Sequence, residues 1–384
     1  MTHIGVYYSF PAGGIGRYNL EWLRRMGLRP GLNIELACLP EFCWDATING
    51  QHWPYLYRIS SPVPTIRRAR FLVGQFLNPR RAIRHFAATG CRVLHCTDVN
   101  HLSFPTWRGQ LDRSGLQFVV TAHDVRRQVA VLNRRYEDRQ LRSIYQRADA
   151  IFVHARAQAE DLVDFAQVDP QCIHIVPHGP YAYGTPTSPR AEVRARYDIP
   201  AEARLGLFFG QLRDEKNLAG LLEAMARGGS QSWLLVAGKA GGHHQSAAVY
   251  RALARDLGIA HRVIFDERFI PDREVADLAN ACDWVALPYR ESFTSQSGVL
   301  NVAAHYGRPV LSGAAPVLAE TVTHHSIGVA AQDDSCDALT TAIHKLEATL
   351  AKSDDSAWGF EAYREAHSWE RNAEITAKVY DDLL

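Results

Sequence analysis

No apolar run in this chain of 384 residues approaches the ~18 residues of a membrane-spanning helix, and stretches such as Trp233–Gly238 are far shorter. The N-terminal sequence MTHIGVYYSFPAGG lacks the basic segment and the long apolar stretch of a secretion signal. The seven cysteines are odd in number and scattered, which is not the pattern of a disulfide framework. We therefore expect a cytoplasmic protein in a reducing compartment. Its core can be large enough to need no disulfide or metal for stability.

Lysine is absent from the first 199 residues, although arginine is abundant there. These residues contain 25 Arg and 16 Asp or Glu, a net charge of +9, whereas the rest contains 17 basic and 25 acidic side chains, a net charge of −8. A basic half favours an anionic partner, such as a membrane surface, a lipid phosphate or a nucleic acid. The alternative is that the two halves simply attract each other.

Several arginines of the first half form two clusters, Arg67, Arg68 and Arg70, and Arg80, Arg81 and Arg84. No recognisable nucleic-acid-binding module surrounds them, so nucleic acid is not an expected partner. An anionic lipid surface or a phosphorylated acceptor fits them better. We therefore expect peripheral association with the inner face of the cell membrane.

Short apolar runs alternate with helical patterns along most of the chain. The expected strands are Ile4–Ser9, Ile34–Leu39, Val93–Cys96, Phe118–Ala122, Ile151–His154, Ile173–Val176, Leu205–Phe209, Trp233–Ala237, Val263–Phe265, Trp284–Leu287 and Pro309–Leu311. The expected helices include Gly16–Met26, Asn217–Ala226 and Arg273–Cys282, each with apolar residues at helical spacing. Fully apolar strands that alternate with helices indicate an α/β fold with parallel sheets covered on both faces.

A break in this pattern predicts the domain organisation. Residues Pro177–Pro200 contain five prolines and two glycines and are typical of a linker, after which the alternation restarts. We expect an acceptor-binding domain at 1–180, a linker at 181–203, a nucleotide-sugar-binding domain at 204–366 and a C-terminal helix at 367–384. The result would be two Rossmann-like, doubly wound domains facing a cleft.

Two candidate sites lie in the first half. Gly13–Arg17 follows the first strand and opens the first helix, where glycines let a ligand approach and the helix N-terminus favours anions. The dinucleotide fingerprint is missing, so a nicotinamide dehydrogenase is not favoured. His123 and Asp124 end an apolar strand, where His can donate a hydrogen bond to a hydroxyl or phosphate and Asp can orient a sugar hydroxyl or take a proton. A turn and a polar loop are the structural alternatives.

Two further loops in the second half leave a strand and enter a helix. The loop after Phe209 carries Arg213 and Lys216, and two cations beside free amides suit a diphosphate. The structural alternative is two solvated charges near Asp214 and Glu215. The loop from Pro288 to Gly298 is rich in hydroxyl residues, which suits phosphate or sugar oxygens. No group of residues has a convincing metal-ligand spacing, so neither a metal nor a cofactor is expected.

Taken in order, these pieces resemble the GT-B glycosyltransferases, specifically the nucleotide-sugar-dependent family 4. The resemblance covers nearly the whole chain and rests on Gly13–Arg17, Thr121–Asp124, Ala148–Val153, Ile175–Gly179, Gly210–Lys216, Val236–Gly238, Phe269–Asp283, Tyr306–Val310 and Ser368–Glu370 followed by a helix. It implies a hexosyltransferase that moves a sugar from a UDP- or GDP-linked donor. The implied acceptor is a lipid-linked glycan or polysaccharide in cell-surface glycan biosynthesis.

The resemblance also implies a role for each site residue. The implied catalytic residues are His123, Asp124, Arg213 and Lys216. The implied donor-binding residues are Gly14, Gly16, Gly210, Phe269, Ile270, Glu291, Thr294, Ser295, Ser297 and Gly298. Arg17 and His178 are expected to contact the acceptor. Arg213, Lys216, helix N-termini and loop amides would stabilise the leaving diphosphate without a metal.

Two positions depart from the family pattern. Gln211 stands where the family has Arg, and Arg213 is the expected replacement. The family's two glutamates, separated by seven residues, fall here on Thr294 and Val302, while Glu291 lies three residues early. Two alternatives stay open. The protein could transfer the sugar to a soluble small molecule, or, as the altered Glu spacing suggests, it could bind a nucleotide sugar or glycan without turnover.

Overall fold

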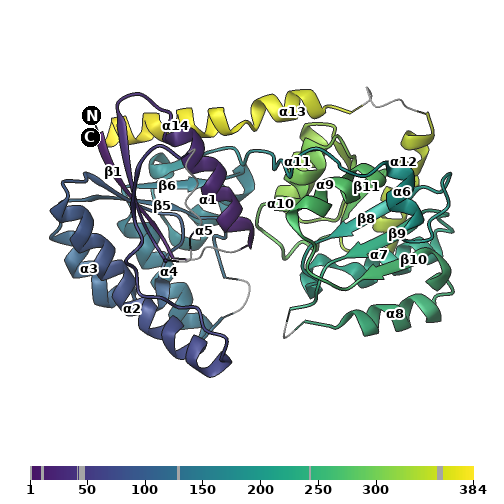
Figure 1. The fold of residues 1–384 in the computed structure, drawn as a ribbon, viewed down its shortest axis with the longest axis horizontal. Coiled ribbons are helices and arrows are strands. Elements are labelled where there is room, and N and C mark those ends of the chain that lie inside the picture. The colour runs from purple at the N-terminus through teal and green to yellow at the C-terminus, as the bar shows by residue number, and fades with distance from the viewer. Residues whose placement is uncertain are drawn as a thin grey trace. The chain divides into compact units, whose positions relative to one another are not determined.

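The computed structural model describes residues 2–9, 13–40, 42, 48–127, 130–241, 244–352 and 358–384. The chain divides into two compact units (Figure 1). Unit 1 consists of Met1–His178 together with Ser368–Leu384, and unit 2 consists of Gly179–His367. None of the described helices is long and apolar enough to cross a membrane.

Unit 1 is built on a seven-stranded parallel sheet with the strand order β3-β2-β1-β4-β5-β6-β7. The strands are β1 (Thr2–Tyr8), β2 (Leu32–Cys38), β3 (Gln51–Trp53), β4 (Val93–Cys96), β5 (Gln117–Thr121), β6 (Ala150–Val153) and β7 (Ile173–Ile175). Strands β4 and β6 are buried along their whole length, because helices cover both faces of a parallel sheet.

The helices of unit 1 form two groups. Helix α14 packs against α1 (Figure 1), so the C-terminal segment returns to unit 1. The other helices of unit 1 contribute buried side chains to a hydrophobic core that they share with the sheet. The helices are α1 (Gly13–Met26), α2 (Pro64–Ala88), α3 (Phe104–Asp112), α4 (Arg134–Arg147), α5 (Arg156–Ala166) and α14 (Trp369–Leu383), with the 3-10 turns His101–Ser103 and Pro170–Cys172.

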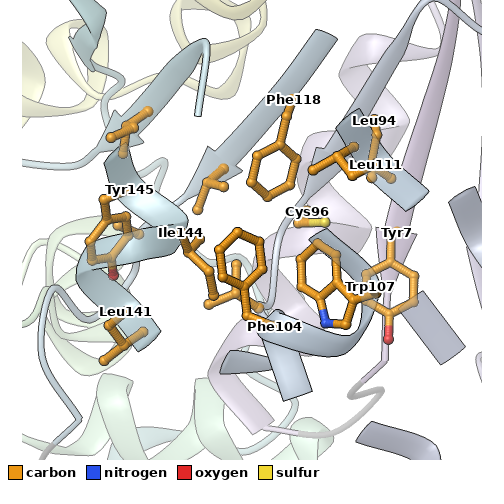
Figure 2. Packing of buried hydrophobic residues seen from close by; sticks show 14 of the residues in the cluster. Tyr7, Leu94, Cys96, Phe104, Trp107, Leu111, Phe118, Leu141, Ile144 and Tyr145 are labelled. Atoms are coloured by element: carbon orange, nitrogen blue, oxygen red, sulfur yellow. The ribbon is translucent and has the colours of Figure 1, made fainter. Parts of the chain in front are cut away.

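Aromatic side chains hold this core together (Figure 2). The Trp107 ring meets Phe104 edge-on at a centroid distance of 4.7 Å and Phe118 of β5 at 6.1 Å. Gly5 of β1 leaves room for α2, because an added Cβ would lie 2.5 Å from the Phe86 ring. Close packing of this kind leaves little free volume around β5, the strand that ends beside His123.

Unit 2 contains a six-stranded parallel sheet with the order β10-β9-β8-β11-β12-β13. The strands are β8 (Leu205–Phe209), β9 (Trp233–Ala237), β10 (Val263–Asp266), β11 (Trp284–Leu287), β12 (Val310–Ser312) and β13 (Gly328–Ala330). The helices are α6 (Arg190–Ala195), α7 (Leu218–Arg227), α8 (Ala247–Asp256), α9 (Asp272–Ala281), α10 (Gly298–His305), α11 (Pro316–His324), α12 (Cys336–Lys352) and α13 (Phe360–Ala366), with the 3-10 turns Asp214–Lys216 and Ala260–Arg262. Both units are Rossmann-like, as the sequence predicted.

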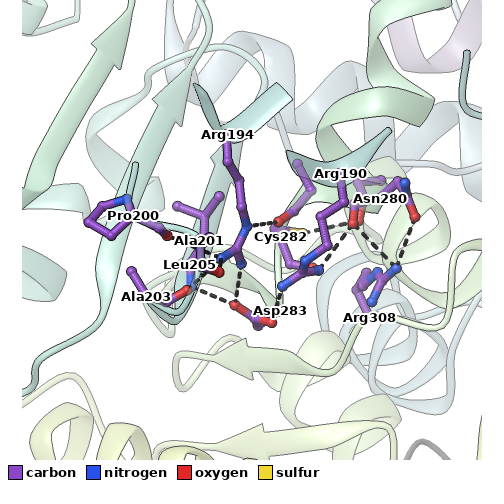
Figure 3. A network of polar contacts seen from close by, with 12 residues as sticks. Arg190, Arg194, Pro200, Ala201, Ala203, Leu205, Asn280, Cys282, Asp283 and Arg308 are labelled. Atoms are coloured by element: carbon purple, nitrogen blue, oxygen red, sulfur yellow. Dashed lines mark hydrogen bonds and ion pairs between the residues drawn. The ribbon is translucent and has the colours of Figure 1, made fainter. Parts of the chain in front are cut away.

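The segment 181–203, predicted as a linker, is instead a structured part of unit 2. It contains α6, whose buried Arg194 donates to the carbonyls of Ala203 at 2.7 Å and Ala281 at 3.1 Å (Figure 3). Asp283 accepts from Arg194 at 2.8 Å and also forms an ion pair with Arg190. A buried guanidinium needs this many acceptors, and they fix the segment to β11 and α9.

Candidate active site

His123 lies just beyond the carboxyl end of β5, beside His154 at the end of β6. The pairing of Thr121 with Phe152 places the two histidines in register two residues later. His123 Nδ1 lies 2.9 Å from His154 Nε2, and His154 Nδ1 lies 3.1 Å from the carbonyl oxygen of Val176. Burial, followed by the neighbouring imidazoles of His154 and His178, holds the pKa of His123 well below its usual range.

Aromatic rings enclose this histidine pair. The Tyr18 ring meets His123 edge-on at 4.6 Å and contacts His178 at 5.1 Å and Trp369 at 5.2 Å. The Tyr18 hydroxyl accepts from Asn372 Nδ2 at 3.1 Å. Helices α1 and α14 therefore both shape the site, and His178, predicted to bind the acceptor, is 6% exposed within it.

Helix α1 starts earlier than predicted and includes Gly14 and Gly16. A Cβ at Gly14 would meet none of the described atoms within 4 Å. Arg17 Nε pairs with Glu21 Oε1 at 3.1 Å, one turn further along. Asp124 follows His123, and its carbonyl accepts from the hydroxyl of Tyr145 at 3.2 Å.

In unit 2, a tight glycine contact forms the loop after β8. Gly210 has a φ of +96°, and a Cβ at Gly238 would lie 1.8 Å from the Gly210 carbonyl oxygen. Both positions therefore require glycine, because a side chain would be strained at one and would clash at the other. The turn brings Lys216 back toward Gly210, so that a Cβ there would lie 3.4 Å from Lys216 Nζ.

Lys216 is a buried cation, only 6% exposed. Burial, followed by the charge of Arg213, lowers the pKa of Lys216 from 10.5 to about 7, and Glu215 acts in the opposite direction. Arg213 Nη1 pairs with Glu215 Oε1 at 3.1 Å. Strongly shifted pKa values beside glycine-rich turns are typical of sites that bind charged ligands.

The loop between β11 and α10 adds hydroxyl groups and a helix N-terminus. Ser297 caps α10 by accepting from the amide of Val299 at 3.3 Å, and Gly298 is the first residue of the helix. Ser295 is buried and Thr294 is half-buried nearby in the sequence. The helix N-terminus and these hydroxyls can receive anionic oxygens.

Glu291, which was predicted to bind the donor, has an exposed side chain, and its backbone amide donates to Asp334 Oδ1 at 3.0 Å. Phe269 is 79% exposed, although Ile270 next to it is buried at 6%. An exposed phenyl ring offers a flat apolar face that suits a nucleobase.

Sequence reasoning did not single out His154, Tyr18 or Tyr289 as site residues. His154 could have been found, because it ends the predicted strand that neighbours the His123 strand, and parallel strands bring their carboxyl ends to one edge. The buried Tyr289 ring lies 5.3 Å from Lys216 Nζ, a contact across 73 residues that no local pattern contains.

One group of described residues has ligand atoms close enough to hold a metal ion, namely His3, Glu35 and Cys91. His3 and Cys91 lie at the amino ends of β1 and β4, the edge opposite to His123. The Glu35 carboxylate already accepts from His85 at 2.5 Å and from the Thr89 hydroxyl at 2.7 Å. These contacts explain the three residues as the hydrogen-bonding surroundings of a buried carboxylate, remote from the candidate active site.

Two family models match successive parts of the chain. Residues 12–180 match Glycosyltransferase Family 4, and residues 189–357 match Glycosyl transferases group 1. The chain belongs to the GT-B glycosyltransferases. Within this glycosyltransferase, the first match covers most of unit 1 apart from its C-terminal segment Ser368–Leu384, and the second covers most of unit 2.

Among curated relatives, a D-inositol 3-phosphate glycosyltransferase of Corynebacterium glutamicum is 26% identical over 62% of this chain and 58% of its own length. A protein of the same name from Xylanimonas cellulosilytica is 29% identical, over 61% of this chain and 57% of its own length. The chain thus spans a little over half the length of the curated relatives that it matches.

Solved structures share the fold at low sequence identity. The sucrose-phosphate synthase from Thermosynechococcus elongatus has a TM-score of 0.76 at 19% identity, covering 100% of this chain and 99% of its own. Anabaena Alr3699/HepE in complex with UDP-glucose has a TM-score of 0.72 at 16% identity, covering 99% of this chain and 100% of its own. These similarities establish the GT-B fold.

Proposed function

We propose that the protein transfers a sugar from a nucleoside-diphosphate donor to an anionic acceptor. The observation that carries the proposal is the buried Lys216, turned back on Gly210 beside Arg213. A buried ammonium with a lowered pKa is costly unless an anion compensates it, and a diphosphate supplies that charge. Anabaena HepE, which shares the fold, was solved with UDP and with UDP-glucose.

In this proposal, unit 2 holds the nucleotide. Phe269 stacks on the base, and the N-terminus of α10 with Ser295 and Ser297 receives phosphate or sugar oxygens. As the glycosidic bond breaks, negative charge grows on the diphosphate, and Arg213 and Lys216 stabilise it. Because two cations and a helix N-terminus are available, we propose that no divalent metal is needed.

Unit 1 would bind the acceptor, and its charge and helix α2 favour an acceptor in a lipid surface. Ile66, Val73 and Phe76 are each more than 40% exposed on α2 and form a stripe along the helix, because they are spaced by seven and three residues. The exposed Arg67 and Arg68 lie on the same helix. A basic helix with exposed apolar residues is typical of proteins that lie on anionic membranes.

A soluble phosphorylated acceptor is the second candidate. The relatives named D-inositol 3-phosphate glycosyltransferase support it, since their name specifies a small anionic acceptor. The basic charge of the first half suits either acceptor. Liposome binding separates the two, because only the lipid-linked acceptor requires a membrane surface.

The first experiment is a thermal-shift screen with UDP, GDP, ADP and dTDP, with Mg²⁺ and with EDTA. A ligand that binds the folded state raises its melting temperature, so one nucleotide should stabilise the protein equally under both conditions. The matching nucleotide sugars are then tested for hydrolysis and transfer. A nucleotide shift without either reaction would indicate a binding protein, and no shift with any nucleotide would contradict the proposed function.

A further inference from the structure

We propose that His154 is a positioning residue, which holds His123 in the tautomer protonated at Nδ1 and so makes His123 Nε2 an acceptor for a sugar hydroxyl. The proposal rests on the proposed function for the identity of the ligand. The tautomer itself follows from the hydrogen bonds and the burial of the two histidines within unit 1.

The series of hydrogen bonds starts at the backbone of Val176. Its carbonyl oxygen lies 3.1 Å from His154 Nδ1, and a carbonyl can only accept, so Nδ1 of His154 carries a proton. His154 is neutral at pH 7, because burial lowers its pKa from 6.5 to about 4. A neutral imidazole has one N–H, so His154 Nε2 presents a lone pair.

His154 Nε2 lies 2.9 Å from His123 Nδ1, so His123 Nδ1 must carry the proton of this hydrogen bond. His123 is neutral as well, for burial and the nearby imidazoles disfavour its charged form. Its Nε2 then carries a lone pair. This atom is buried and has no hydrogen-bond partner among the described residues.

The reverse hydrogen bond, from His154 to His123, is unfavourable in either of its two possible forms. If His154 Nε2 donated to His123, then His154 would either become a buried imidazolium or turn a lone pair toward the Val176 carbonyl. Gln158 also holds the geometry, because its Oε1 accepts from the His154 amide at 2.8 Å and its Nε2 donates to the His123 carbonyl at 2.9 Å.

The direction of these hydrogen bonds determines which ligand groups His123 can bind. A bare Nε2 accepts a hydrogen bond, so the ligand group beside it must donate one, as a sugar hydroxyl does. An ionised phosphate oxygen would place a second lone pair against it. His123 would thus orient the sugar and would not donate to the leaving phosphate, which narrows the role expected from the sequence.

The tautomer can be measured in the free protein, by long-range ¹H–¹⁵N NMR of the intact chain labelled with ¹⁵N-histidine. At pH 7.5 we expect His123 to show the Nδ1–H tautomer. In His154→Phe, which removes the acceptor, this preference should be lost. His154→Gln keeps an acceptor oxygen near the Nε2 position and should retain it. His174→Phe on β7 is the matched control, because it removes a half-buried histidine that lies outside the hydrogen-bonded chain.

Kinetics provide the second readout. We expect His154→Phe to lower kcat/KM by about 10- to 100-fold, with substantial recovery in His154→Gln and UDP affinity unchanged in both. An Nε2–H tautomer or an imidazolium at His123 in the parent protein would overturn the proposal. So would a His154→Phe variant with unchanged tautomer and kinetics. Failure to transfer any sugar would instead count against the proposed function, since the tautomer is read without substrate.

Discussion

The Lys216 ammonium lies 5.3 Å from the centre of the Tyr289 ring, inside a site with almost no solvent access. An aromatic face attracts a cation, but it replaces little of the lost hydration. The remaining cost appears as the low pKa of Lys216, about 7. A positive charge on Lys216 is therefore unfavourable in the free site, and a bound anion would favour the charged form.

Replacing Lys216 with Met should separate activity from stability. We expect the transfer rate to fall by ~10²-fold or more, because the leaving diphosphate loses a charge-stabilising partner. The melting temperature at pH 7 should stay the same or rise, because the substitution removes a buried ionisable group. Steady-state kinetics and thermal unfolding measure the two effects. A large loss of stability would mean that Lys216 is structural.

The pH dependence of nucleotide affinity gives a second test of Lys216. Its pKa of about 7 means that the free site is mostly neutral at pH 8, so diphosphate binding should draw in a proton. UDP affinity should therefore weaken from pH 7.5 to 9, by at most about tenfold per pH unit. Calorimetry in buffers of different ionisation enthalpy measures the proton uptake directly. Lys216→Arg, which stays charged, should bind UDP with a flat profile over this range.

The same shift predicts how folding stability changes with pH. The pKa of Lys216 is lower in the folded state than in the unfolded state, so the unfolded chain binds more protons between about pH 7 and 10. This residue therefore makes the fold more stable as the pH rises through that window. The free energy of unfolding of the parent protein should therefore rise relative to that of Lys216→Met as the pH rises through this window.

Gly210→Ala should weaken nucleotide binding through geometry. The residue has a φ of +96°, and the added Cβ would lie 3.4 Å from Lys216 Nζ. Gly229→Ala is the matched control, because Gly229 also has a positive φ, +63°, yet no described atom lies within 4 Å of an added Cβ. Both variants should lose about 1–2 kcal/mol of stability from backbone strain. Only Gly210→Ala should lower UDP affinity, and equal affinities in the two would disconnect this loop from the nucleotide.

The regular strands of both units could be predicted from sequence because they are apolar and buried on both faces. Strands β4, β8, β9 and β11 have the predicted bounds. Strand β3, Gln51–Trp53, was missed because it is a short edge strand with no apolar run. Helix α2 was also not predicted as one element, since Pro79 lies inside it and Pro usually ends a helix.

The site was harder to predict where it depends on long-range packing. His123 and Lys216 stood out because each follows an apolar strand. The partner of His123 depends on the β5–β6 register, and the burial of Lys216 depends on a loop that returns to Gly210. Proline content made 181–203 resemble a linker, whereas the buried Arg194 ties that segment to unit 2.

Phe269 should contribute to nucleotide binding without contributing to the fold. It is 79% exposed, so Phe269→Ala leaves no cavity and should not change the melting temperature. Loss of base stacking should weaken UDP binding by about 1–3 kcal/mol, measured by calorimetry. Val249→Ala on α8, where the parent residue is 48% exposed, controls for removal of an exposed apolar side chain. Equal UDP affinity in the two variants would place the base elsewhere.

We expect the exposed residues of helix α2 to be required for binding to anionic membranes. The best residues to change are Arg67, Arg68 and Phe76, which are exposed, and not Arg80, whose guanidinium donates to the Thr106 carbonyl at 2.7 Å and so supports the fold. Arg67→Glu with Arg68→Glu should abolish sedimentation with vesicles containing anionic lipid, and high salt should weaken the parent protein's binding, because salt screens the attraction between exposed charges. Phe76→Ser should weaken binding even at low salt, because it removes apolar contact with the lipid.

The matched control for the α2 double variant reverses two exposed arginines elsewhere in unit 1, Arg113→Glu with Arg135→Glu. It has the same net charge as the α2 variant, so a general electrostatic attraction would be reduced equally in both. Stronger loss in the α2 variant locates the lipid contact on that helix. If the parent protein does not bind anionic vesicles but glycosylates a soluble phosphorylated molecule, that small molecule is the acceptor. The basic charge of the first half would then attract its phosphate.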